Sequence, residues 1–309
     1  RALCDDFREA VGRNCPITID QEGGRVQRLR APLASDWQPP LEDVQRFGEK
    51  AERAMELRAQ IIALELRGLG IDGNCVPCLA IARPATHPVL RNRCYGEDLE
   101  TVVKIGRAVM RGTVAGGVLP VVKHMPGHGL GTLDSHLELP RVAADTATLE
   151  ACDFAAFHAL RDAPLGMSAH LVFEALDTRP ATISPRIIDL IRKQIGFSGL
   201  LMTDDIGMEA LSGTVAERGC AALEAGCDLV LHCNGDLDEM RSLHAATGAS
   251  AMTPGRSNPS THFSRRSFCS RSGGKRRPPA FAASAARMNA PCPSSRARCS
   301  TQSRLPIFR

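Results

Sequence analysis

Short apolar runs that alternate with helical stretches restrict the fold of this 309-residue chain more than any other feature of its sequence. The runs lie at residues 16–20, 71–79, 118–123, 165–170, 200–204 and 228–233. Each run is apolar along most of its length, as expected of strands in a parallel sheet that is covered on both faces. The sequence therefore predicts six parallel strands separated by helices, which is an α/β fold.

Two of the intervening stretches carry clear helix signals. Residues 41–62 have apolar side chains at helical spacing, and Gly68 and Gly70 end that pattern. Ser184 is a typical N-cap residue, and Pro185 suits the first helical turn because its missing amide hydrogen would have no partner there. A second helix is therefore expected to begin at Pro185 and to end near Gly196.

Two α/β architectures fit this order, an open doubly wound sheet and a closed eight-stranded barrel. A nucleotide-binding doubly wound sheet needs a glycine-rich turn after its first strand, but Asp20 and Glu22 stand there, and carboxylates repel phosphate. Several strands instead end in reactive side chains, namely Asp20, Lys123, His124, His170, Asp204, Asp205, His232 and Asn234. Barrel enzymes carry their active sites at this end of the strands, so the pattern favours a TIM-like (β/α)8 barrel.

Charge is divided unevenly along the chain. The formal net charge is +4, but residues 245–309 hold 12 of the 38 Lys and Arg and none of the 34 Asp and Glu. The first part is therefore acidic, which gives no reason to expect a nucleic-acid partner. The Arg-, Ser- and Pro-rich end has too few aliphatic residues to offset the entropy of ordering it. We predict a catalytic domain over residues 1–243 and a basic tail over 244–309 that is disordered or read out of frame.

The sequence carries no targeting or membrane signal. It has no apolar run of about 18 residues, and its charged start does not resemble a secretory signal, so we expect a cytoplasmic protein with no membrane partner. The twelve cysteines are scattered and are expected to be reduced thiols. Cys75 and Cys78 have CxxC spacing, but they stand in a predicted strand without a second pair, so we expect them in the core.

A histidine-rich segment is the densest group of reactive residues. The run KHMPGHG extends from Lys123 to Gly129, and Asp134-Ser135-His136 follows it. If Asp134 accepts a hydrogen bond from one imidazole nitrogen of His136, the other nitrogen becomes more basic and is free to move a proton. The spacing therefore favours a proton-transfer dyad of Asp134 and His136.

The same segment leaves a metal site as an alternative. His124 and His128, together with Asp204, are residue types that bind Zn²⁺, which would give a metal-dependent barrel hydrolase. The two histidines share one face only in a helix, and Pro126 and Gly127 disfavour a helix there. We therefore expect no metal and no organic cofactor, and the metal-dependent hydrolase remains the alternative.

Carboxylates at two other strand ends complete the candidate site. Asp204 follows an almost wholly apolar strand, where a carboxylate is either functional or a helix cap, and the adjacent Asp205 is expected to be the structural one. Asp20 precedes a tight glycine turn that leads to Arg28. Carboxylates and guanidinium groups in a cleft suit a ligand with many hydroxyl groups. Tyr95 is expected to line the same site.

Four segments resemble, in order and spacing, the bacterial β-N-acetylglucosaminidases of glycoside hydrolase family 3. They are ITIDQEGGRVQRL, RPATHPVLRNRCYG, VVKHMPGHGLGTLDSHLELP and GFSGLLMTDDIGMEAL. The resemblance covers about residues 1–243 and implies a retaining enzyme that removes terminal β-linked N-acetylglucosamine from peptidoglycan fragments, the GlcNAc-1,6-anhydroMurNAc peptides. It implies that Asp204 is the nucleophile and that His136 is the acid/base, tuned by Asp134. The implied substrate-binding residues are Asp20, Arg28, Arg93, Lys123 and His124.

The resemblance also sets expectations for the whole protein. It implies a monomeric TIM-like barrel whose ligand is a small carbohydrate, the muropeptide. Measured against the family pattern, the chain is expected to lack the first barrel strand and the C-terminal closing elements, and Ala80 stands where the family usually has aspartate. An inactive barrel remnant that binds sugar or misfolds is therefore the second alternative.

Overall fold

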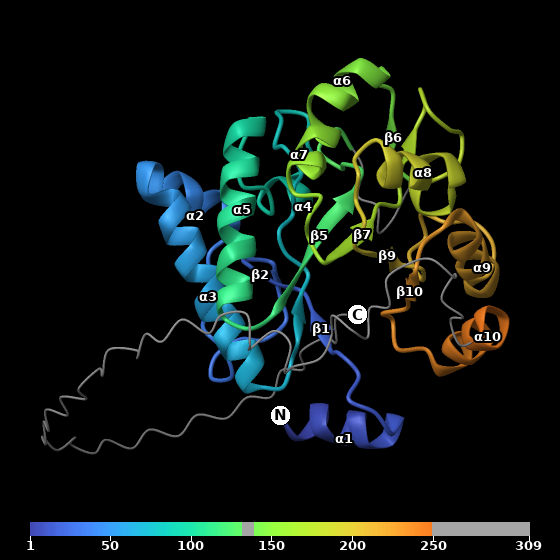
Figure 1. The fold of residues 1–309 in the computed structure, drawn as a ribbon, viewed down its shortest axis with the longest axis horizontal. Coiled ribbons are helices and arrows are strands. Elements are labelled where there is room, and N and C mark those ends of the chain that lie inside the picture. The colour runs from blue at the N-terminus through green and yellow to red at the C-terminus, as the bar shows by residue number, and fades with distance from the viewer. Residues whose placement is uncertain (132–138, 249–309) are drawn as a thin grey trace, which may run out of the picture. The chain divides into compact units, whose positions relative to one another are not determined.

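The computed structural model describes residues 1–131 and 139–248. Within these ranges, six strands form one sheet in chain order, and every neighbouring pair is parallel (Figure 1). These strands are β1 (Thr18–Ile19), β4 (Gly73–Asn74), β5 (Leu119–Met125), β7 (Leu165–Ser168), β9 (Leu200–Asp205) and β10 (Leu229–Leu231). Each overlaps one of the six predicted runs, so the predicted α/β fold with the parallel sheet of a TIM-like barrel is confirmed.

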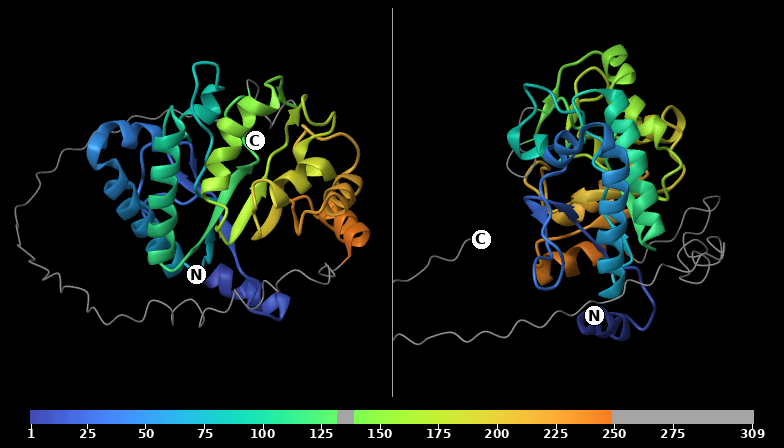
Figure 2. Two further views of the ribbon diagram at one scale, coloured as in Figure 1. Left: turned by 45° about the horizontal axis from the view of Figure 1, so that its top comes forward. Right: turned by 90° about the vertical axis from the view of Figure 1, so that its left-hand side faces the viewer.

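Helices occupy the connections between successive strands (Figures 1 and 2). They are α2 (Pro40–Phe47), α3 (Ala51–Gly68), α4 (Pro88–Arg91), α5 (Leu99–Ala115), α6 (Thr146–Ala151), α7 (Asp153–Ala159), α8 (Pro185–Lys193) and α9 (Val215–Ala225), with short 3-10 turns at Gly48–Lys50 and Ala181–Ile183. The predicted helix over residues 41–62 is confirmed as α2 and α3, and α3 ends at Gly68, the first of the two predicted stop glycines. A further helix, α10 (Leu237–Thr247), follows β10 and contains the predicted domain division at residue 243. That division remains a prediction.

Two small strand pairs flank the main sheet. β2 (Gln21–Gly23) and β3 (Val26–Gln27) form an antiparallel hairpin directly after β1, and β6 (Arg141–Val142) pairs in parallel with β8 (Val172–Phe173). All three residues of β2 are buried. The hairpin therefore brings the acidic side chain of Glu22 into the interior.

Helix α8 shows why the local sequence signals were reliable. The Ser184 hydroxyl accepts a hydrogen bond from the Ile187 amide at 3.1 Å, and Pro185 occupies the first turn. The apolar side of the helix, including Ile188 and Ile191, is buried in the main core cluster. Cap, first-turn proline and apolar spacing agree with one another, which confirms the predicted helix start.

Glycines on α5 allow this helix to lie directly against α3 (Figures 1 and 2). A Cβ atom at Gly112 would lie 2.1 Å from the backbone oxygen of Glu56 and 3.0 Å from the Ala59 Cβ. Gly112→Ala is therefore expected to lower the free energy of unfolding by about 1–3 kcal/mol, because the helices must separate to admit the methyl group. Denaturant unfolding measures this. Gly68→Ala is the control, since a Cβ there meets nothing within 4 Å, and equal losses in both variants would contradict the expectation.

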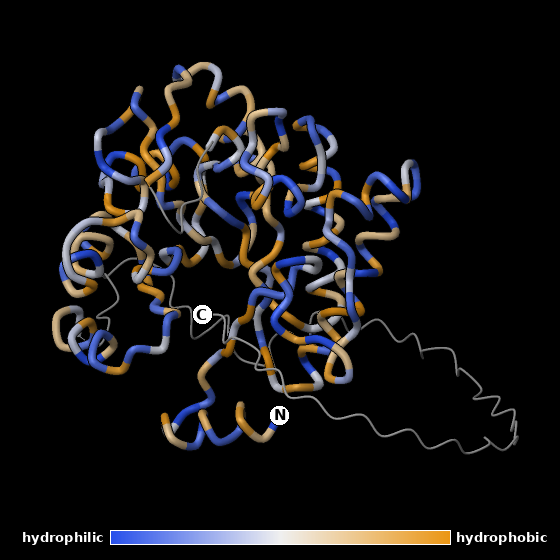
Figure 3. The backbone as a smooth tube through the Cα atoms, turned by 180° about the vertical axis from the view of Figure 1, so that it is seen from behind, coloured by the Kyte–Doolittle hydropathy of each residue, from blue (hydrophilic) through white to orange (hydrophobic). Residues whose placement is uncertain are grey.

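Helix α1 (Ala2–Val11) contributes no buried residue. Leu3, Phe7 and Val11 are 80%, 54% and 42% exposed, and hydrophobic and hydrophilic segments alternate along this helix in Figure 3. Arg8 attaches the helix to the sheet, because its Nη2 lies 2.5 Å from Asp72 Oδ2. None of the helices within residues 1–131 and 139–248 combines the length and the apolar character that a membrane span requires.

The two cysteines with CxxC spacing are core residues, as predicted. Cys75 and Cys78 are 5% and 1% exposed, and both are free thiols. Burial raises the pKa of the Cys75 thiol to about 12, so it stays protonated at neutral pH. A protonated, enclosed thiol is a poor metal ligand and a poor nucleophile.

Candidate active site

Four charged side chains, Asp20, Glu22, Arg93 and Lys123, form a charge cluster where β1, β2 and β5 meet. The Lys123 Nζ lies 2.7 Å from Asp20 Oδ1 and 2.6 Å from Glu22 Oε1. Arg93 donates from Nε to Glu22 Oε2 at 3.0 Å and from Nη2 to Glu22 Oε1 at 2.8 Å. Glu22 is thus held by a two-point contact with Arg93 and by the ammonium of Lys123, an arrangement that fixes all three side chains.

The charge cluster is largely buried, and Asp20 is its most exposed member. The side chains of Glu22 and Lys123 are each 1% exposed, and that of Arg93 is 15% exposed, whereas Asp20 keeps 33% of its side chain exposed. Buried charges persist only when they are paired and hydrogen-bonded, and each charge here has at least one opposite partner. Asp20 is therefore the member best placed to meet a ligand.

Electrostatic attraction keeps the charge cluster ionised. Burial alone would raise the pKa of Asp20, but the adjacent Lys123 ammonium, followed by Arg93 and Arg28, lowers it to about 2. Burial also opposes ionisation of Glu22, and the charges of Arg93 and Lys123 outweigh it and lower the pKa of that carboxyl. Asp20 and Glu22 are both carboxylates at neutral pH and can accept hydrogen bonds only.

Arg28 stands at the edge of this group. Its Nη2 lies 3.7 Å from Asp20 Oδ2, and its side chain is 63% exposed. That distance is too long for a hydrogen bond, so the Arg28 guanidinium is only weakly held beside the exposed side chain of Asp20.

His124, the next residue after Lys123 on β5, approaches the carboxylate of Asp204 at the end of β9. The His124 Nε2 lies 3.6 Å from Asp204 Oδ2, and the Asp204 side chain is 22% exposed. Burial lowers the pKa of His124 well below its usual value, and the cations Arg93 and Lys123 lower it further. His124 is therefore a neutral imidazole beside Asp204, and consecutive residues of β5 connect Asp204 to the charge cluster.

The two glycines of the KHMPGHG run, Gly127 and Gly129, allow the loop after β5 to pack closely against Arg83 and Asp153. A Cβ atom at Gly127 would lie 2.5 Å from the Cβ of Asp153, and one at Gly129 would lie 2.6 Å from Arg83 Nη1. Arg83 and Asp153 form an ion pair at 2.7 Å, and Thr86 Oγ1 donates to the Gly129 carbonyl at 2.7 Å. The loop after β5 therefore packs directly against the Arg83–Asp153 ion pair. A side chain at position 127 or 129 would prevent this close contact.

Asp205 and His170 fix the backbone beside Asp204. Asp205 Oδ1 accepts hydrogen bonds at 3.0 Å from the amides of Gly207 and Cys233, which agrees with the structural role expected from the sequence. His170 bonds through Nδ1 to Thr182 Oγ1 at 2.8 Å and through Nε2 to the Asp205 carbonyl at 2.9 Å. Both ring nitrogens are occupied, so His170 supports the strand end.

Six of the eight residues expected at the site lie in the described residues, and the contacts above bring them to one end of the sheet. They are Asp20, Arg28, Arg93, Lys123, His124 and Asp204. The other two, Asp134 and His136, lie within residues 132–138, outside the described residues. Sequence reasoning missed Glu22, although it follows Asp20 at the two-residue spacing that places side chains on one face of a strand.

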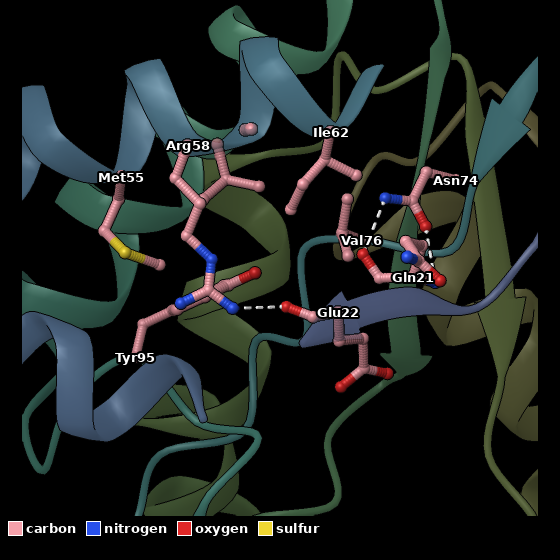
Figure 4. Close-up of a pocket in the computed structure, with 10 residues that line it drawn as sticks. Gln21, Glu22, Met55, Arg58, Ile62, Asn74, Val76 and Tyr95 are labelled. Carbon is pink, nitrogen blue, oxygen red and sulfur yellow. Dashed lines mark hydrogen bonds between the residues drawn. The ribbon is translucent and has the colours of Figure 1, made fainter. Parts of the chain in front are cut away.

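Tyr95 does not line the active site, contrary to the expectation from the sequence. It is 2% exposed and borders a small internal cavity with Met55, Arg58 and the inner side of β2 (Figure 4). Its aromatic ring packs with core residues of α3 and α5. The position two residues after Arg93 is misleading, because Arg93 points toward Glu22 whereas Tyr95 points into the core.

The metal-site alternative needs His124, His128 and Asp204 to meet at one point. The rings of His124 and His128 have centroids 5.8 Å apart. Within the described residues, no three His, Cys, Asp or Glu side chains are grouped so as to hold a metal ion.

Stability is expected to fall as the pH drops below about 6.5. Burial lowers the pKa of His124, His128 and His170 in the folded protein, whereas the unfolded chain binds protons near pH 6.5. Each imidazole thus costs up to about 1.4 kcal/mol of stability per pH unit on acidification. Asp20, with its pKa lowered to about 2, adds a further loss between about pH 4 and pH 2.

Urea unfolding at a series of pH values from 8 to 5 measures how the free energy of unfolding changes with pH. His128→Asn is expected to reduce the loss of stability between about pH 6.5 and 5, because one fewer imidazole then takes up a proton on unfolding. Stability that stays constant over this interval in the parent protein would contradict the prediction.

Comparison with known proteins supports the resemblance to glycoside hydrolase family 3. The family described as "Glycosyl hydrolase family 3 N terminal domain" matches residues 5–256. The β-hexosaminidase of Bordetella avium is 36% identical over 245 residues, which cover 75% of this chain and 69% of that protein. The β-hexosaminidase of Vibrio cholerae is 37% identical over 242 residues, covering 75% of this chain and 70% of that protein.

Solved structures give the same result. NagZ from Neisseria gonorrhoeae, in complex with N-trifluoroacetyl-D-glucosamine, matches with a TM-score of 0.70 and 32% identity, covering 77% of this chain and 70% of NagZ. A family 3 β-N-acetylglucosaminidase from Paenibacillus matches with a TM-score of 0.70 and 32% identity, covering 86% and 52%. The chain belongs to glycoside hydrolase family 3 and is an enzyme of its β-hexosaminidase group.

Proposed function

We propose that this protein is a retaining exo-β-N-acetylglucosaminidase with Asp204 as its nucleophile. The observation that carries the proposal is the contact of His124 with Asp204 next to the charge cluster, because it joins a reactive carboxylate to side chains that suit sugar hydroxyls. The binding of an N-acylated glucosamine by the related NagZ from Neisseria gonorrhoeae supports the same substrate class.

In the first half of the reaction, the Asp204 carboxylate attacks the anomeric carbon as the bond to the leaving group breaks. His136 donates a proton to the departing glycosidic oxygen, and Asp134 stabilises the imidazolium before that transfer. The product is a covalent glycosyl ester on Asp204 with inverted anomeric configuration.

In the second half, His136 removes a proton from water, and the water oxygen attacks the anomeric carbon. The ester bond to Asp204 breaks, and N-acetylglucosamine leaves with the β configuration of the substrate. A histidine suits both halves because its ordinary pKa lies near neutral pH, and it adds no second negative charge beside the nucleophile.

The charge cluster and its neighbours bind the sugar in this proposal. Asp20 accepts hydrogen bonds from sugar hydroxyls, and Lys123, Arg93 and Arg28 donate to them or to the N-acetyl oxygen. Neutral His124 completes the contacts beside the nucleophile. Because Glu22 and Lys123 hold these groups before the sugar arrives, little reorganisation is needed when it binds.

The wider proposal follows from the substrate class. The chain acts as a monomer in the cytoplasm on GlcNAc-1,6-anhydroMurNAc peptides, and it thereby takes part in peptidoglycan recycling. It needs no metal or organic cofactor. The predicted division into a catalytic domain over residues 1–243 and a basic tail over 244–309 belongs to the same proposal, and the residues after 248 lie outside the described part of the chain.

The full chain should release 4-nitrophenol from its β-N-acetylglucosaminide and should act much more slowly on the β-glucoside, which lacks the acetamido group. Proton NMR of the first sugar released should show the β anomer, because two inversions retain the configuration. Release of the α anomer would contradict a covalent intermediate on Asp204.

The same assay separates the two alternatives. Loss of activity in a chelator such as EDTA would favour the metal-dependent hydrolase that uses His124 and His128. A chain that unfolds cooperatively on heating and yet releases no 4-nitrophenol would be an inactive remnant. A chain without any cooperative transition would be misfolded.

A further inference from the structure

We propose that Arg58, a residue of α3, is a positioning residue for sugar binding, because it fixes the backbone of Glu22 behind the charge cluster. The proposal rests on the proposed function of that cluster. Arg58 itself does not reach the substrate side, and its guanidinium acts through the β2 backbone.

Arg58 makes several buried contacts on the inner side of β2. Its side chain is 4% exposed, and its Nη1 lies 2.5 Å from Asp43 Oδ2 on α2. Its Nη2 donates to the Glu22 carbonyl at 2.6 Å and to the Gln38 carbonyl at 2.8 Å. The guanidinium carbon also lies 5.4 Å from the ring centroid of Trp37. One cation therefore joins the hairpin, the following loop and helix α2.

The backbone carbonyl and the side-chain carboxylate of Glu22 have different partners. Figure 4 shows its carbonyl oxygen directed at Arg58 and its carboxylate directed away from Arg58. The carboxylate is the group that binds Arg93 and Lys123. A shift of the Glu22 carbonyl therefore moves the carboxylate that holds two of the proposed sugar-binding cations.

The local sequence is built to allow this contact. A Cβ atom at Gly23 would lie 2.0 Å from Arg58 Nη2, so any other residue at position 23 would displace the guanidinium. Gly23 also has φ +107°, a conformation that side-chain-bearing residues rarely adopt. The glycine of this turn thus serves the approach of Arg58 as well as the turn itself.

The surroundings leave room for Glu22 to move if Arg58 is lost. A small cavity lies between α3 and β2 and is bordered by Glu22, Arg58, Tyr95 and Met55 (Figure 4). Removing the guanidinium would enlarge this cavity and leave the Glu22 carbonyl without its buried donor. An unsatisfied buried carbonyl tends to shift toward another partner.

The test separates positioning from simple stabilisation. Arg58→Met alone leaves the buried Asp43 carboxylate with only the exposed Arg46 as a counter-ion, whose Nη1 lies 4.0 Å from Asp43 Oδ1. Losing the buried partner is destabilising, so the main variant is Arg58→Met combined with Asp43→Leu. Arg53→Met is the matched control, since Arg53 lies on the same helix in an exposed pair with Glu56. Arg58→Lys keeps the positive charge but cannot bond two carbonyls and a carboxylate in one plane.

For hydrolysis of the 4-nitrophenyl β-N-acetylglucosaminide, KM should rise about tenfold in the double variant and about threefold in Arg58→Lys. KM should be unchanged in Arg53→Met. A role in stability alone changes the amount of folded enzyme, which lowers the apparent kcat and leaves KM as it was. An unchanged KM in a folded double variant would therefore overturn the proposal, and if that variant does not fold, an unchanged KM in Arg58→Lys would do so.

A second measurement does not depend on turnover. The amides of Arg28 and Leu29 donate to Gln21 Oε1 at 3.0 Å, so they report the order of the hairpin that carries Glu22. Their hydrogen exchange should become about tenfold faster in the double variant, with no change in β7. If the parent chain does not hydrolyse the substrate, the proposed function fails, and unchanged exchange at these amides is what would overturn the role of Arg58.

Discussion

Asp204→Asn should abolish hydrolysis of the 4-nitrophenyl β-N-acetylglucosaminide, with a loss in kcat of about 10⁴-fold, while the protein keeps its fold. An amide has almost the same shape as a carboxylate but is not a nucleophile. The existing contacts tolerate it, because Asp204 Oδ1 accepts a hydrogen bond from the Asp205 amide at 2.8 Å, and an asparagine oxygen can do the same. Steady-state kinetics and thermal unfolding of the same preparation measure both quantities.

Two further variants make this result specific. Asp205→Asn is the control: its carboxylate has a backbone role, so the variant should lose stability and retain far more activity than Asp204→Asn. Asp204→Gly with added azide should form the α-glycosyl azide, because azide enters the space of the missing carboxylate and attacks from the same face. Unimpaired turnover by Asp204→Asn would show that another group forms the covalent bond.

Glu22→Gln is expected to have the second-largest effect. The change removes the carboxylate shared by Arg93 and Lys123, and the Lys123 side chain is 1% exposed. Breaking a buried ion pair on one side costs about 3–5 kcal/mol, which corresponds to a fall in Tm of about 10 °C for a protein of this size. We also expect kcat/KM to fall about 100-fold, since Arg93 and Lys123, the cations proposed to bind the sugar, lose their fixed geometry.

For Glu22→Gln, calorimetry measures the fall in Tm and steady-state kinetics measures the fall in kcat/KM. The matched control is Glu56→Gln, which breaks surface ion pairs with Arg53 and Arg111 and should change stability by about 1 kcal/mol or less. Similar melting temperatures for the Glu22 and Glu56 variants would mean that the buried carboxylate is not the counter-ion that the contacts indicate.

The main features of the fold were predictable because they depend on local patterns. All six parallel strands were foreseen from short apolar runs, since a strand covered on both faces needs apolar residues throughout. The start of α8 was foreseen from Ser184 and Pro185, which act within one helical turn. In both cases the information lies within a few residues of the element it specifies.

The candidate site was predictable only in part, because some roles depend on partners that are distant in the chain. Asp20 directly follows β1, and Lys123 lies in the C-terminal half of β5, near the strand ends where chemistry is expected in a barrel. Glu22 gains its role from Arg93, 71 residues away, and Arg58 bonds the Glu22 carbonyl from 36 residues away. A backbone acceptor has no signature in sequence, and an arginine within a helix is ordinarily interpreted as an exposed residue.

The misplaced Tyr95 has a similar physical cause. Its neighbour Arg93 turns toward Glu22, whereas the Tyr95 ring packs in the core with Met55 and Val109. Two residues that are close in sequence in an irregular segment need not face the same way, and no period of 2 or 3.6 applies there. Outside regular elements, adjacency in sequence is weak evidence for a shared site.

The pairing of charges around Glu22 also bears on how a substrate is selected. Asp20, Glu22 and Asp204 carry three negative charges, and Arg28, Arg93 and Lys123 carry three positive charges, so these six side chains together are electrically neutral. A neutral group exerts little attraction at a distance, and an uncharged sugar is not steered toward it across a Debye length of about 8 Å. If this cluster binds the sugar as proposed, recognition depends on short-range hydrogen-bond geometry, and the affinity for the sugar ring is expected to vary little with salt concentration.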